Sequence, residues 1–569
     1  MWFLQRAEQY DAIVVGSGVS GGWAAKELCE KGLKTLVLER GRDFDPSKDY
    51  FNEHKPSWQF PLRERKLTPA QSPDHPVQAV TPSYQEPTTH LFLKDRENPY
   101  VEDEPFLWVQ GNQVGGRSLM WGRQSYRWSD LDFEANLKDG HGVDWPIRYA
   151  DIAPWYSYVE RFAGISGQRE NMPQAPDSEF QPPMEMNAAE KFVKAGIEQA
   201  YPERRMTIGR SAVLTAPLGD RLPCHYCGPC IRGCSTKSFF SSHSSTLPAA
   251  RKTGNLTVRP NSIVRSVIVD AETRRATGVR FVDTESGETH EVNARVVFLC
   301  ASALASTRIL LNSKSPAHPN GLGGESGALG RYIMDHHVRL GARGQVPGLL
   351  DRYFQGNRPN GIYLIRFRNL KGPDSDKLDF VRGYAYQGGA GRANWTRGAG
   401  RPEIGAELKE ALHDPGPWSM GLGGFGECLP REDNYVALAD KTDPWGIPVL
   451  RVHVTWGENE LAMRRDVASQ AAEMLEASGC KNVTPYDSLD TRIANPGGSI
   501  HEMGGARMGR DAKTSVLNAH NQLWDAPNVF VTDGACMGSS SCVNPSLTYM
   551  ALTARAADHA VKELNRRTL

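Results

Sequence analysis

Four cysteines with the spacing of metal ligands lie within eleven residues of this 569-residue chain. Their pattern, C-x2-C-x2-C-x3-C, is the bacterial ferredoxin pattern without its final proline. Closely spaced thiolates in a loop with Gly and Pro can converge on one cluster, so the pattern favours an iron–sulfur site. Zinc held by four thiolates, and cysteines with a purely structural or disulfide role, stay open as alternatives. The residues concerned are Cys224, Cys227, Cys230 and Cys234.

A second candidate site combines His501 with Asn544. His501 precedes a small, glycine-rich turn, and Asn544-Pro545 precedes a helical pattern that runs to about residue 565. Asn544 suits the N-cap of this helix and Pro545 its first turn, and the partial positive charge of the N-terminus favours an anion. A histidine alone is usually structural, but its pairing with Asn544 in this setting favours a functional role.

The elements that must position these residues begin with a strand, a tight turn, a helix and a second strand. Residues 12–15 form an apolar run typical of a buried parallel strand. The turn at 16–21 reads Gly-x-Gly-x-x-Gly, residues 23–31 have a helical pattern, and residues 35–38 form the next strand, which ends at Glu39. In this context the motif indicates a dinucleotide-binding turn rather than a turn without a ligand.

Each glycine of the motif has its own task. Gly16 permits the tight turn, Gly18 lets a pyrophosphate approach the backbone, and Gly21 lets helix and strand pack closely. The helix N-terminus offers free N–H groups to the phosphates, and Glu39 can accept hydrogen bonds from ribose hydroxyls. Nicotinamide and flavin enzymes share this motif, so the motif alone leaves both cofactors open.

The rest of the chain adds further elements of both types. A second glycine-rich loop at 111–122 lets backbone lie against a flat ring, and another buried strand and helix follow at 296–311. The stretch at about 340–455 is β-rich, and an amphipathic helix is predicted over 458–478. His336-His337 could suggest a metal site, but adjacent side chains point apart in an extended backbone, so a structural role is favoured.

The composition excludes several classes of protein. Lys+Arg and Asp+Glu are both 66, so the formal net charge is zero and no basic run points to nucleic acid. No apolar run reaches the roughly 18–20 residues of a membrane helix, and 13 Trp, 19 Phe and 18 Tyr supply a core that disordered chains lack. Residues 1–9 lack the basic start and apolar stretch of an export signal, which taken alone indicates the cytoplasm.

Together these segments resemble the glucose–methanol–choline (GMC) family of flavoprotein oxidoreductases, from Asp11 to about Leu564. Within that family the sequence is most similar to the pyranose oxidases and to the FAD-binding catalytic subunits of bacterial glucoside 3-dehydrogenases. Besides the opening motif, the resemblance rests on Val114-Gly115-Gly116, Gly426-Glu427, Leu429-Pro430, Asn434, residues 443–448, the His501 turn and Asn544-Pro545.

The resemblance implies an α/β fold with a Rossmann-like FAD-binding domain and a second, β-sheet-rich substrate-binding domain. We expect the FAD-binding domain to comprise residues 1–45, 100–150, 220–335 and 490–569, with the cysteine cluster in the loop 222–236. The substrate-binding domain and its surface loops are expected to comprise residues 46–99, 151–219 and 336–489.

The resemblance also assigns roles within the site. It implies that His501 is the catalytic base and Asn544 its partner, and that both contact the substrate together with Gln124 and Ser499. Val264 would contact the adenine, and Asp533 with Gly534 would lie near the ribityl chain. The full set of expected FAD-binding residues is Gly16, Gly18, Gly21, Glu39, Gly115, Gly116, Ser118, Val264, Asp533, Gly534, Asn544 and Thr548.

Two positions vary among relatives of this kind. Many carry a second histidine at the position of Asn544. The pyranose oxidases, like this chain, have asparagine there. Some pyranose oxidases attach FAD covalently through a histidine two residues after the serine of the second glycine-rich loop. This chain has Met120 there, two residues after Ser118, so noncovalent FAD is expected.

Three hypotheses for the function differ in what the cysteines do. The first is a dehydrogenase that oxidises a secondary hydroxyl, expected at C3, of glucosides or other pyranosides. Its electrons would leave FAD through an iron–sulfur cluster, [3Fe–4S] by resemblance or [4Fe–4S] with four ligands, to an acceptor such as a cytochrome c. The second is a pyranose or glycoside oxidase that uses oxygen directly and has structural cysteines. The third is a flavin-bearing scaffold subunit without catalysis, against which His501 and Asn544 argue.

The resemblance extends to partners and compartment. Similar complexes are exported together with a small subunit that carries the signal, and they pass electrons to a cytochrome. We therefore expect such a subunit as partner and the periplasm as compartment, with the cytoplasm as the alternative. The expected substrate is an uncharged sugar or glycoside, and neither nucleic acid nor a membrane span of its own is expected.

Overall fold

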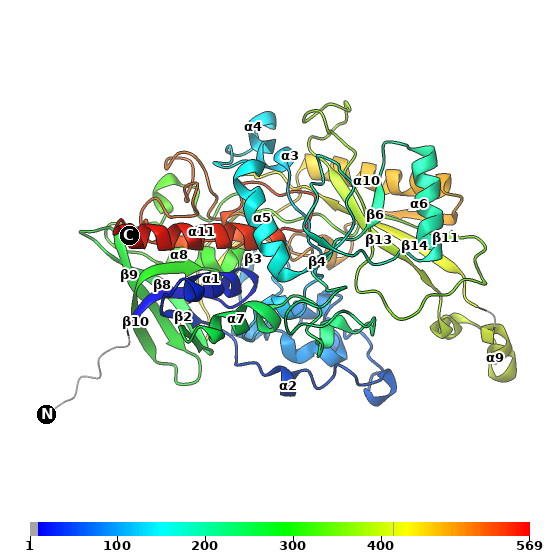
Figure 1. The fold of residues 1–569 in the computed structure, drawn as a ribbon, viewed down its shortest axis with the longest axis horizontal. Coiled ribbons are helices and arrows are strands. Elements are labelled where there is room, and N and C mark those ends of the chain that lie inside the picture. The colour runs from blue at the N-terminus through cyan, green and yellow to red at the C-terminus, as the bar shows by residue number, and fades with distance from the viewer. Residues whose placement is uncertain (1–8, 414) are drawn as a thin grey trace.

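The computed structural model describes residues 9–413 and 415–569. Residues 1–8, on which most of the expectation about an export signal rests, lie outside the described part of the chain. Within the described ranges, no helix is both long and apolar enough to cross a membrane. Two large β-sheets lie toward opposite ends of the molecule, and the C-terminal helix runs beside the first of them (Figure 1).

The larger sheet has a parallel part and an antiparallel part. β1, β2, β7, β10 and β18 pair in parallel, whereas β8 and β9 extend the sheet from β10 in antiparallel pairs. β2 is buried along its whole length, as expected of a strand covered on both faces. The order is β7-β2-β1-β10-β9-β8, with β18 beside β10. The strands are β1 (Tyr10–Val15), β2 (Thr35–Leu38), β7 (Leu256–Arg259), β8 (Ser262–Asp270), β9 (Arg275–Asp283), β10 (Thr289–Leu299) and β18 (Val529–Val531).

Helices α1 and α11 pack against each other beside this sheet, with α7 on α1 and α5 on α11 (Figure 1). α1 begins at Val19, earlier than the predicted start at residue 23, because Gly21 and Gly22 belong to the helix and allow its close packing. The helices are α1 (Val19–Glu30), α5 (Tyr149–Ala163), α7 (Leu247–Lys252), α8 (Ala303–Asn312) and α11 (Ser546–Arg566).

The start of α11 differs from the prediction. The helix begins at Ser546 and Pro545 occupies the N-cap, so the assignment of Asn544 as N-cap is wrong. The physical reason lies in the side chain, because the Asn544 amide is engaged by Gln387 and His501 and is not turned back to the helix. Because the Asn544 amide does not cap the helix, it is available for contacts in the site.

The second sheet is antiparallel and follows the order β17-β11-β14-β13-β12-β6. Along β14 every second residue is buried, among them Trp418, Met420 and Leu422, which is the pattern of a strand with one face on a core. Helices α6 (Ala188–Ala200) and α10 (Glu458–Ala477) pack on this sheet. The strands are β6 (Met206–Ile208), β11 (Gly341–Val346), β12 (Ile362–Leu364), β13 (Tyr384–Arg392), β14 (Trp418–Gly426) and β17 (Lys481–Tyr486).

The remaining elements are small. β16 pairs with β15 on one side and with β3 on the other in a three-stranded sheet, and β4 pairs with β5. Their bounds, with those of the short helices, are β3 (Val101–Glu102), β4 (Ile165–Ser166), β5 (Phe180–Gln181), β15 (Tyr435–Thr442), β16 (Pro448–His453), α2 (Pro46–Asp49), α3 (Asp130–Phe133), α4 (Ala135–Asp139) and α9 (Gly405–His413).

The two large sheets draw on different parts of the chain. All strands of the larger sheet come from ranges expected in the FAD-binding domain, and all strands of the second sheet come from ranges expected in the substrate-binding domain. The expected α/β fold with a second, β-rich part is confirmed. α5 departs from the expected boundaries, because it was grouped with the second domain but packs on α11 beside the first sheet.

Candidate active site

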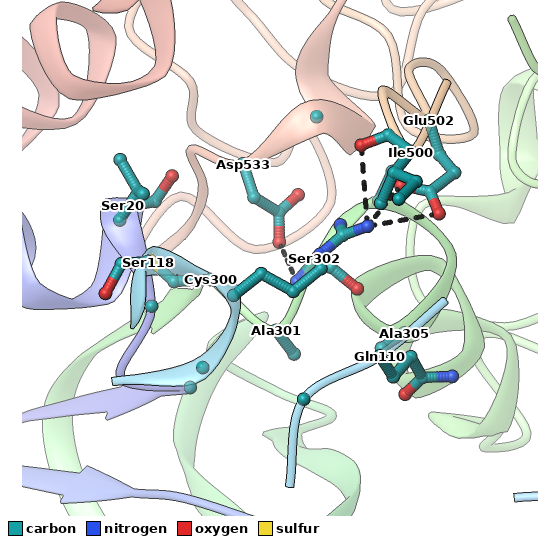
Figure 2. A pocket seen from close by; sticks show the side chains of 18 of the residues that line it. Ser20, Gln110, Ser118, Cys300, Ala301, Ser302, Ala305, Ile500, Glu502 and Asp533 are labelled. Atoms are coloured by element: carbon teal, nitrogen blue, oxygen red, sulfur yellow. Dashed lines mark hydrogen bonds and ion pairs between the residues drawn. The ribbon is translucent and has the colours of Figure 1, made fainter. Parts of the chain in front are cut away.

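A cavity of about 600 Å³ lies at the carboxyl ends of β1, β2 and β10. Glu39, His501 and Asn544 all line it, and the turn at 16–20 forms part of its wall. Crevices at the carboxyl ends of parallel strands are the usual ligand sites of open α/β sheets. Figure 2 shows part of this wall, where Ser302 and Cys300 lie beside Asp533.

The turn between β1 and α1 is shaped to receive a phosphate group. α1 starts at the cavity with no side-chain cap and no acidic residue in its first turn, so its first N–H groups are available to an anion. A Cβ on Gly18 would find no atom within 4 Å, which leaves this approach open. A Cβ on Gly21 would lie 1.9 Å from the carbonyl oxygen of Gly16, so close packing of turn and helix requires glycine there.

Two buried acids in the cavity wall are held by the turns around them. Glu39 accepts hydrogen bonds from the backbone N–H and the hydroxyl of Ser17, at 3.0 and 2.5 Å. Asp533 accepts from the N–H of Ser302 at 3.0 Å and from the Ser306 hydroxyl at 2.5 Å. Burial raises the pKa of Asp533 to about 6. Both acids line the cavity, and their hydrogen bonds fix the neighbouring turns of its wall.

Arg117 ties the second glycine-rich loop to the turn that carries His501. Its Nη1 donates to the Glu502 carboxylate at 3.0 Å and lies 3.5 Å from the Ile500 carbonyl oxygen. Figure 2 shows Ile500 and Glu502 together at this side of the cavity, joined by dashed lines to one guanidinium group. The pair holds the backbone on either side of His501 at a fixed distance from the second glycine-rich loop.

The His501 ring is surrounded by polar groups that come from distant parts of the chain. Its Nε2 lies 3.3 Å from Nδ2 of Asn544, whose Oδ1 accepts a hydrogen bond from Gln387. Its Nδ1 lies 2.8 Å from the Ser499 hydroxyl and 3.0 Å from Nδ1 of His336. The predicted pair of His501 and Asn544 is therefore in hydrogen-bond contact at the cavity wall.

His336 and Asp335 are site residues that local spacing did not reveal. A β-bridge between Met334 and Met503 brings the two segments together, and buried Asp335 accepts the backbone N–H of His501 at 3.1 Å. His336 is fully buried and faces the His501 ring nearly at right angles. Because the segments are far apart in sequence, only the long-range bridge gives a signal for this contact.

The surroundings of His501 lower its pKa well below the ordinary 6.5, first through loss of water around the ring and then through His336 and Arg117. The neutral ring is the form that can accept a proton, and it predominates above the pKa. We therefore expect a reaction in which His501 accepts a proton to keep a constant rate from about pH 8 to about pH 6 and to slow only in more acidic solution. Stopped-flow measurements across this range check the prediction, and a midpoint at or above 6.5 would contradict it.

The cavity wall contains most of the residues predicted for cofactor and substrate. They are Gly16, Gly18, Glu39, Gly116, Ser118, Gln124, Val264, Ser499, His501, Asp533, Gly534 and Asn544, together with Met120. Gly21 and Gly115 support the wall from behind, and the N–H of Gly115 donates to Ser17 at 2.8 Å. Thr548 is fully buried and its hydroxyl lies 2.7 Å from that of Tyr156, so it joins α11 to α5 and is not part of the lining.

The cysteine loop reaches the same cavity. Ile231, the residue after Cys230, lies in the cavity wall. The backbone N–H of Tyr226 points at Sγ of Cys224 and that of Ser238 at Sγ of Cys234, at 3.4 and 3.2 Å. All four cysteines are free thiols. Across the described ranges, no three His, Cys, Asp or Glu side chains are grouped so that they could hold a metal ion.

The family of the chain follows from two matches to family models. Both models are described as GMC oxidoreductase, and they match residues 10–338 and residues 430–553. The chain is a GMC oxidoreductase. Membership in this flavoprotein family implies FAD, and the uncapped start of α1, the open approach at Gly18 and the buried Glu39 fit that cofactor.

Several characterised proteins are similar to this GMC oxidoreductase. The 2-methyl-1,2-propanediol dehydrogenase of Mycolicibacterium austroafricanum is 27% identical over 97% of this chain and 95% of its own. The fructose dehydrogenase large subunit of Gluconobacter japonicus is 24% identical over 97% and 98% of the two chains. The C-glycoside 3-oxidase of Microbacterium trichothecenolyticum is 27% identical over 54% and 55%. The formate oxidase of Aspergillus oryzae RIB40 shares the fold, with a TM-score of 0.60, 12% identity and coverage of 99% and 100%.

Proposed function

We propose that this GMC oxidoreductase oxidises a secondary hydroxyl of a glycoside or other pyranoside to a keto-sugar, with C3 as the position. The observation that carries the proposal is the contact between His501 Nε2 and Asn544 at the wall of a cavity suited to FAD. Relatives named for fructose and for position 3 of C-glycosides support a sugar substrate.

The two site residues supply complementary parts of the chemistry. Oxidation of a CH–OH group to a carbonyl removes a hydride from carbon and a proton from oxygen. FAD, when bound, supplies the hydride acceptor. His501 takes the hydroxyl proton at Nε2, and Asn544 orients the hydroxyl through an amide that does not titrate. Gln387 holds that amide in place through its oxygen.

A panel of sugars tests this proposal. The protein, loaded with FAD and supplied with a dye as electron acceptor, is incubated with methyl glucosides, free pyranoses, gluconate and simple diols. We expect turnover with the pyranosides and a new ketone at C3 in the product, identified by NMR. Turnover of diols or gluconate alone would overturn the sugar assignment, and a ketone at another carbon would overturn the assignment of C3.

Noncovalent attachment of FAD is part of the proposal. The cavity-lining residue at the position where some relatives carry the linking histidine is Met120, whose thioether cannot form that bond. Mild denaturation of the holoprotein should therefore release free FAD. Flavin that stays on the polypeptide after denaturation would show that another side chain makes a covalent link.

We further propose that electrons leave through an iron–sulfur cluster in the cysteine loop, where the four thiols would have to move together from their positions in this structure to hold it. Two backbone N–H groups directed at thiols and the place of Ile231 in the cavity wall support this route. Arg123 adds an electrostatic argument. Its guanidinium is buried, its Nε has no hydrogen-bond partner in the described structure, and it lies within electrostatic range of the thiols of Cys224, Cys230 and Cys234. Thiolate-bound iron would supply the negative charge that such a cation favours.

Iron and sulfide analysis of anaerobically purified protein tests this route. We expect iron and acid-labile sulfide in the ratio of a [3Fe–4S] or [4Fe–4S] cluster, with an electron paramagnetic resonance signal in one redox state. Cys230→Ser should lose iron and keep FAD, whereas Cys480→Ala, which changes a buried cysteine near the second sheet, should keep both. Zinc in place of iron, or no metal at all, would refute the relay.

The proposed route also implies partners. A dehydrogenase of this kind would pass its electrons to a protein such as a cytochrome c and would be co-exported to the periplasm with a small signal-bearing subunit. Direct use of oxygen is the alternative, as in the C-glycoside 3-oxidase relative. Peroxide formed in air in proportion to the keto-sugar would favour the oxidase, and its absence while a dye is reduced would favour the dehydrogenase.

A further inference from the structure

The hydrogen bonds around His336 determine which of its ring nitrogens carries a proton. Its Nε2 contacts the carbonyl oxygen of Ser541, and a carbonyl can only accept, so Nε2 carries the hydrogen. Burial lowers the pKa of His336 to about 4, which makes the ring neutral near pH 7. Its other nitrogen, Nδ1, therefore has a lone pair and can only accept a hydrogen bond.

The protonation of His336 determines which nitrogen of His501 carries a hydrogen. Nδ1 of His336 lies 3.0 Å from Nδ1 of His501, and because the first atom is an acceptor, the hydrogen between them belongs to His501. A neutral His501 with its hydrogen on Nδ1 has the lone pair on Nε2. The Ser499 hydroxyl, 2.8 Å from the same Nδ1, can accept the hydrogen as a second partner.

A second chain of hydrogen bonds, which starts from another part of the fold, leads to the same tautomer. Gln387 in β13 donates to Oδ1 of Asn544, which leaves the amide nitrogen of Asn544 turned toward His501. This nitrogen lies 3.3 Å from Nε2 of His501. An amide nitrogen can only donate, so Nε2 must accept. Both chains thus place the lone pair on Nε2, where it accepts the hydrogen bond from Asn544.

We propose that His336 is a positioning residue that fixes His501 in the tautomer with hydrogen on Nδ1, so that the Nε2 lone pair is turned toward Asn544 in the cavity wall. The inference deepens the proposed function, because it takes His501 Nε2 as the atom that accepts the substrate proton. After His501 gains that proton, its Nδ1–H still donates to His336, and the contact is kept as positive charge develops. Without His336, Ser499 can donate to Nδ1 instead and turn the ring into the unproductive tautomer.

Nitrogen NMR of the holoprotein with ¹⁵N-labelled histidine reads the tautomer without any substrate. The His501 signals are identified by their loss in His501→Ala. We expect a protonated Nδ1 and an unprotonated Nε2 for His501, and the reverse pattern for His336. A protonated Nε2 on neutral His501 in the unmutated protein would overturn the proposal, whether or not any variant folds. A failure to oxidise sugars would refute the proposed function and leave this reading intact.

Two variants of His336 separate the hydrogen bond from packing. His336→Leu removes the acceptor, and His336→Gln keeps a donor for Ser541 and an acceptor for His501. With FAD still bound, we expect His336→Leu to give a mixture of His501 tautomers and to slow flavin reduction about 10- to 100-fold, as loss of such orienting partners does. His336→Gln should restore most of both.

The neighbouring His337 provides the matched control. It is fully buried, and neither of its ring nitrogens has a hydrogen-bond partner in the described structure. His337→Leu should therefore keep the His501 tautomer of the unmutated protein. If His336→Leu also keeps that single tautomer, or if His336→Gln is as slow as His336→Leu, the proposed role of His336 is wrong.

Discussion

Replacing His501 with alanine should slow the reduction of bound FAD by a glycoside about 10²- to 10⁴-fold, the usual contribution of a positioned general base. The reason is local, because Nε2 of His501, which contacts Asn544 in the cavity wall, is the proposed proton acceptor. FAD should stay bound, since the turn at 16–20 and Glu39, which also line the cavity, are unchanged by the substitution. Anaerobic stopped-flow spectroscopy measures the rate, and the flavin spectrum measures occupancy.

A matched variant separates loss of the base from loss of the site. Ser499→Ala removes a hydroxyl 2.8 Å from His501 Nδ1 but leaves Nε2 and its lone pair in place. It should therefore slow flavin reduction far less than His501→Ala does. Unaltered reduction in His501→Ala, with FAD bound, would exclude this residue as the base.

Alanine at Gly21 and alanine at Gly18 should affect two different properties, the stability of the protein and its affinity for FAD. Gly21→Ala would place a Cβ 1.9 Å from the backbone oxygen of Gly16, and because backbone cannot move aside easily, overpacking should lower the free energy of unfolding by about 3 kcal/mol. Gly18→Ala meets no atom within 4 Å and has an ordinary extended backbone, so the protein without FAD should keep its stability. The new methyl group would instead occupy the approach to the N-terminus of α1 and weaken FAD binding.

Denaturant titration of the apoproteins and FAD titration distinguish the two effects. The predicted result is a destabilised Gly21→Ala protein and a stable Gly18→Ala protein with reduced FAD affinity. Equal stability of both variants would refute the packing role of Gly21. Undiminished FAD affinity in Gly18→Ala would refute the role of the turn in pyrophosphate binding.

The parts of the molecule that follow local patterns could be predicted from the sequence. The glycine motif at 16–21 forms the turn after β1 and the start of α1 because short-range constraints determine it, and the buried run of β2 ends before Glu39 as expected. The family resemblance predicted His501 as a site residue, and His501 lies in the cavity wall. The helix over 458–478 was predicted within one residue, since its apolar periodicity and Gly479 define it.

The contacts that complete the site depend on long-range pairing, which no local pattern contains. The sequence favoured a structural role over metal binding for His336. Its contact with His501 arises only because Met334 pairs with Met503. Arg117 meets Glu502 across an even longer separation in sequence. The misplaced cap at Asn544 has the same cause, because a competing partner on β13 engages the side chain. Local sequence propensity contains no information about a hydrogen-bond partner that lies so far away in sequence.

The most direct test of sugar oxidation at His501 is anaerobic mixing of the FAD-loaded protein with a methyl glucoside. We predict that the oxidised flavin spectrum bleaches in a single turnover, that one 3-keto-glycoside forms per flavin reduced, and that His501→Ala does both at least about 100-fold more slowly while still holding FAD. A flavin that stays oxidised with every pyranoside, or one that is reduced equally well by the His501→Ala protein, would contradict the proposed reaction.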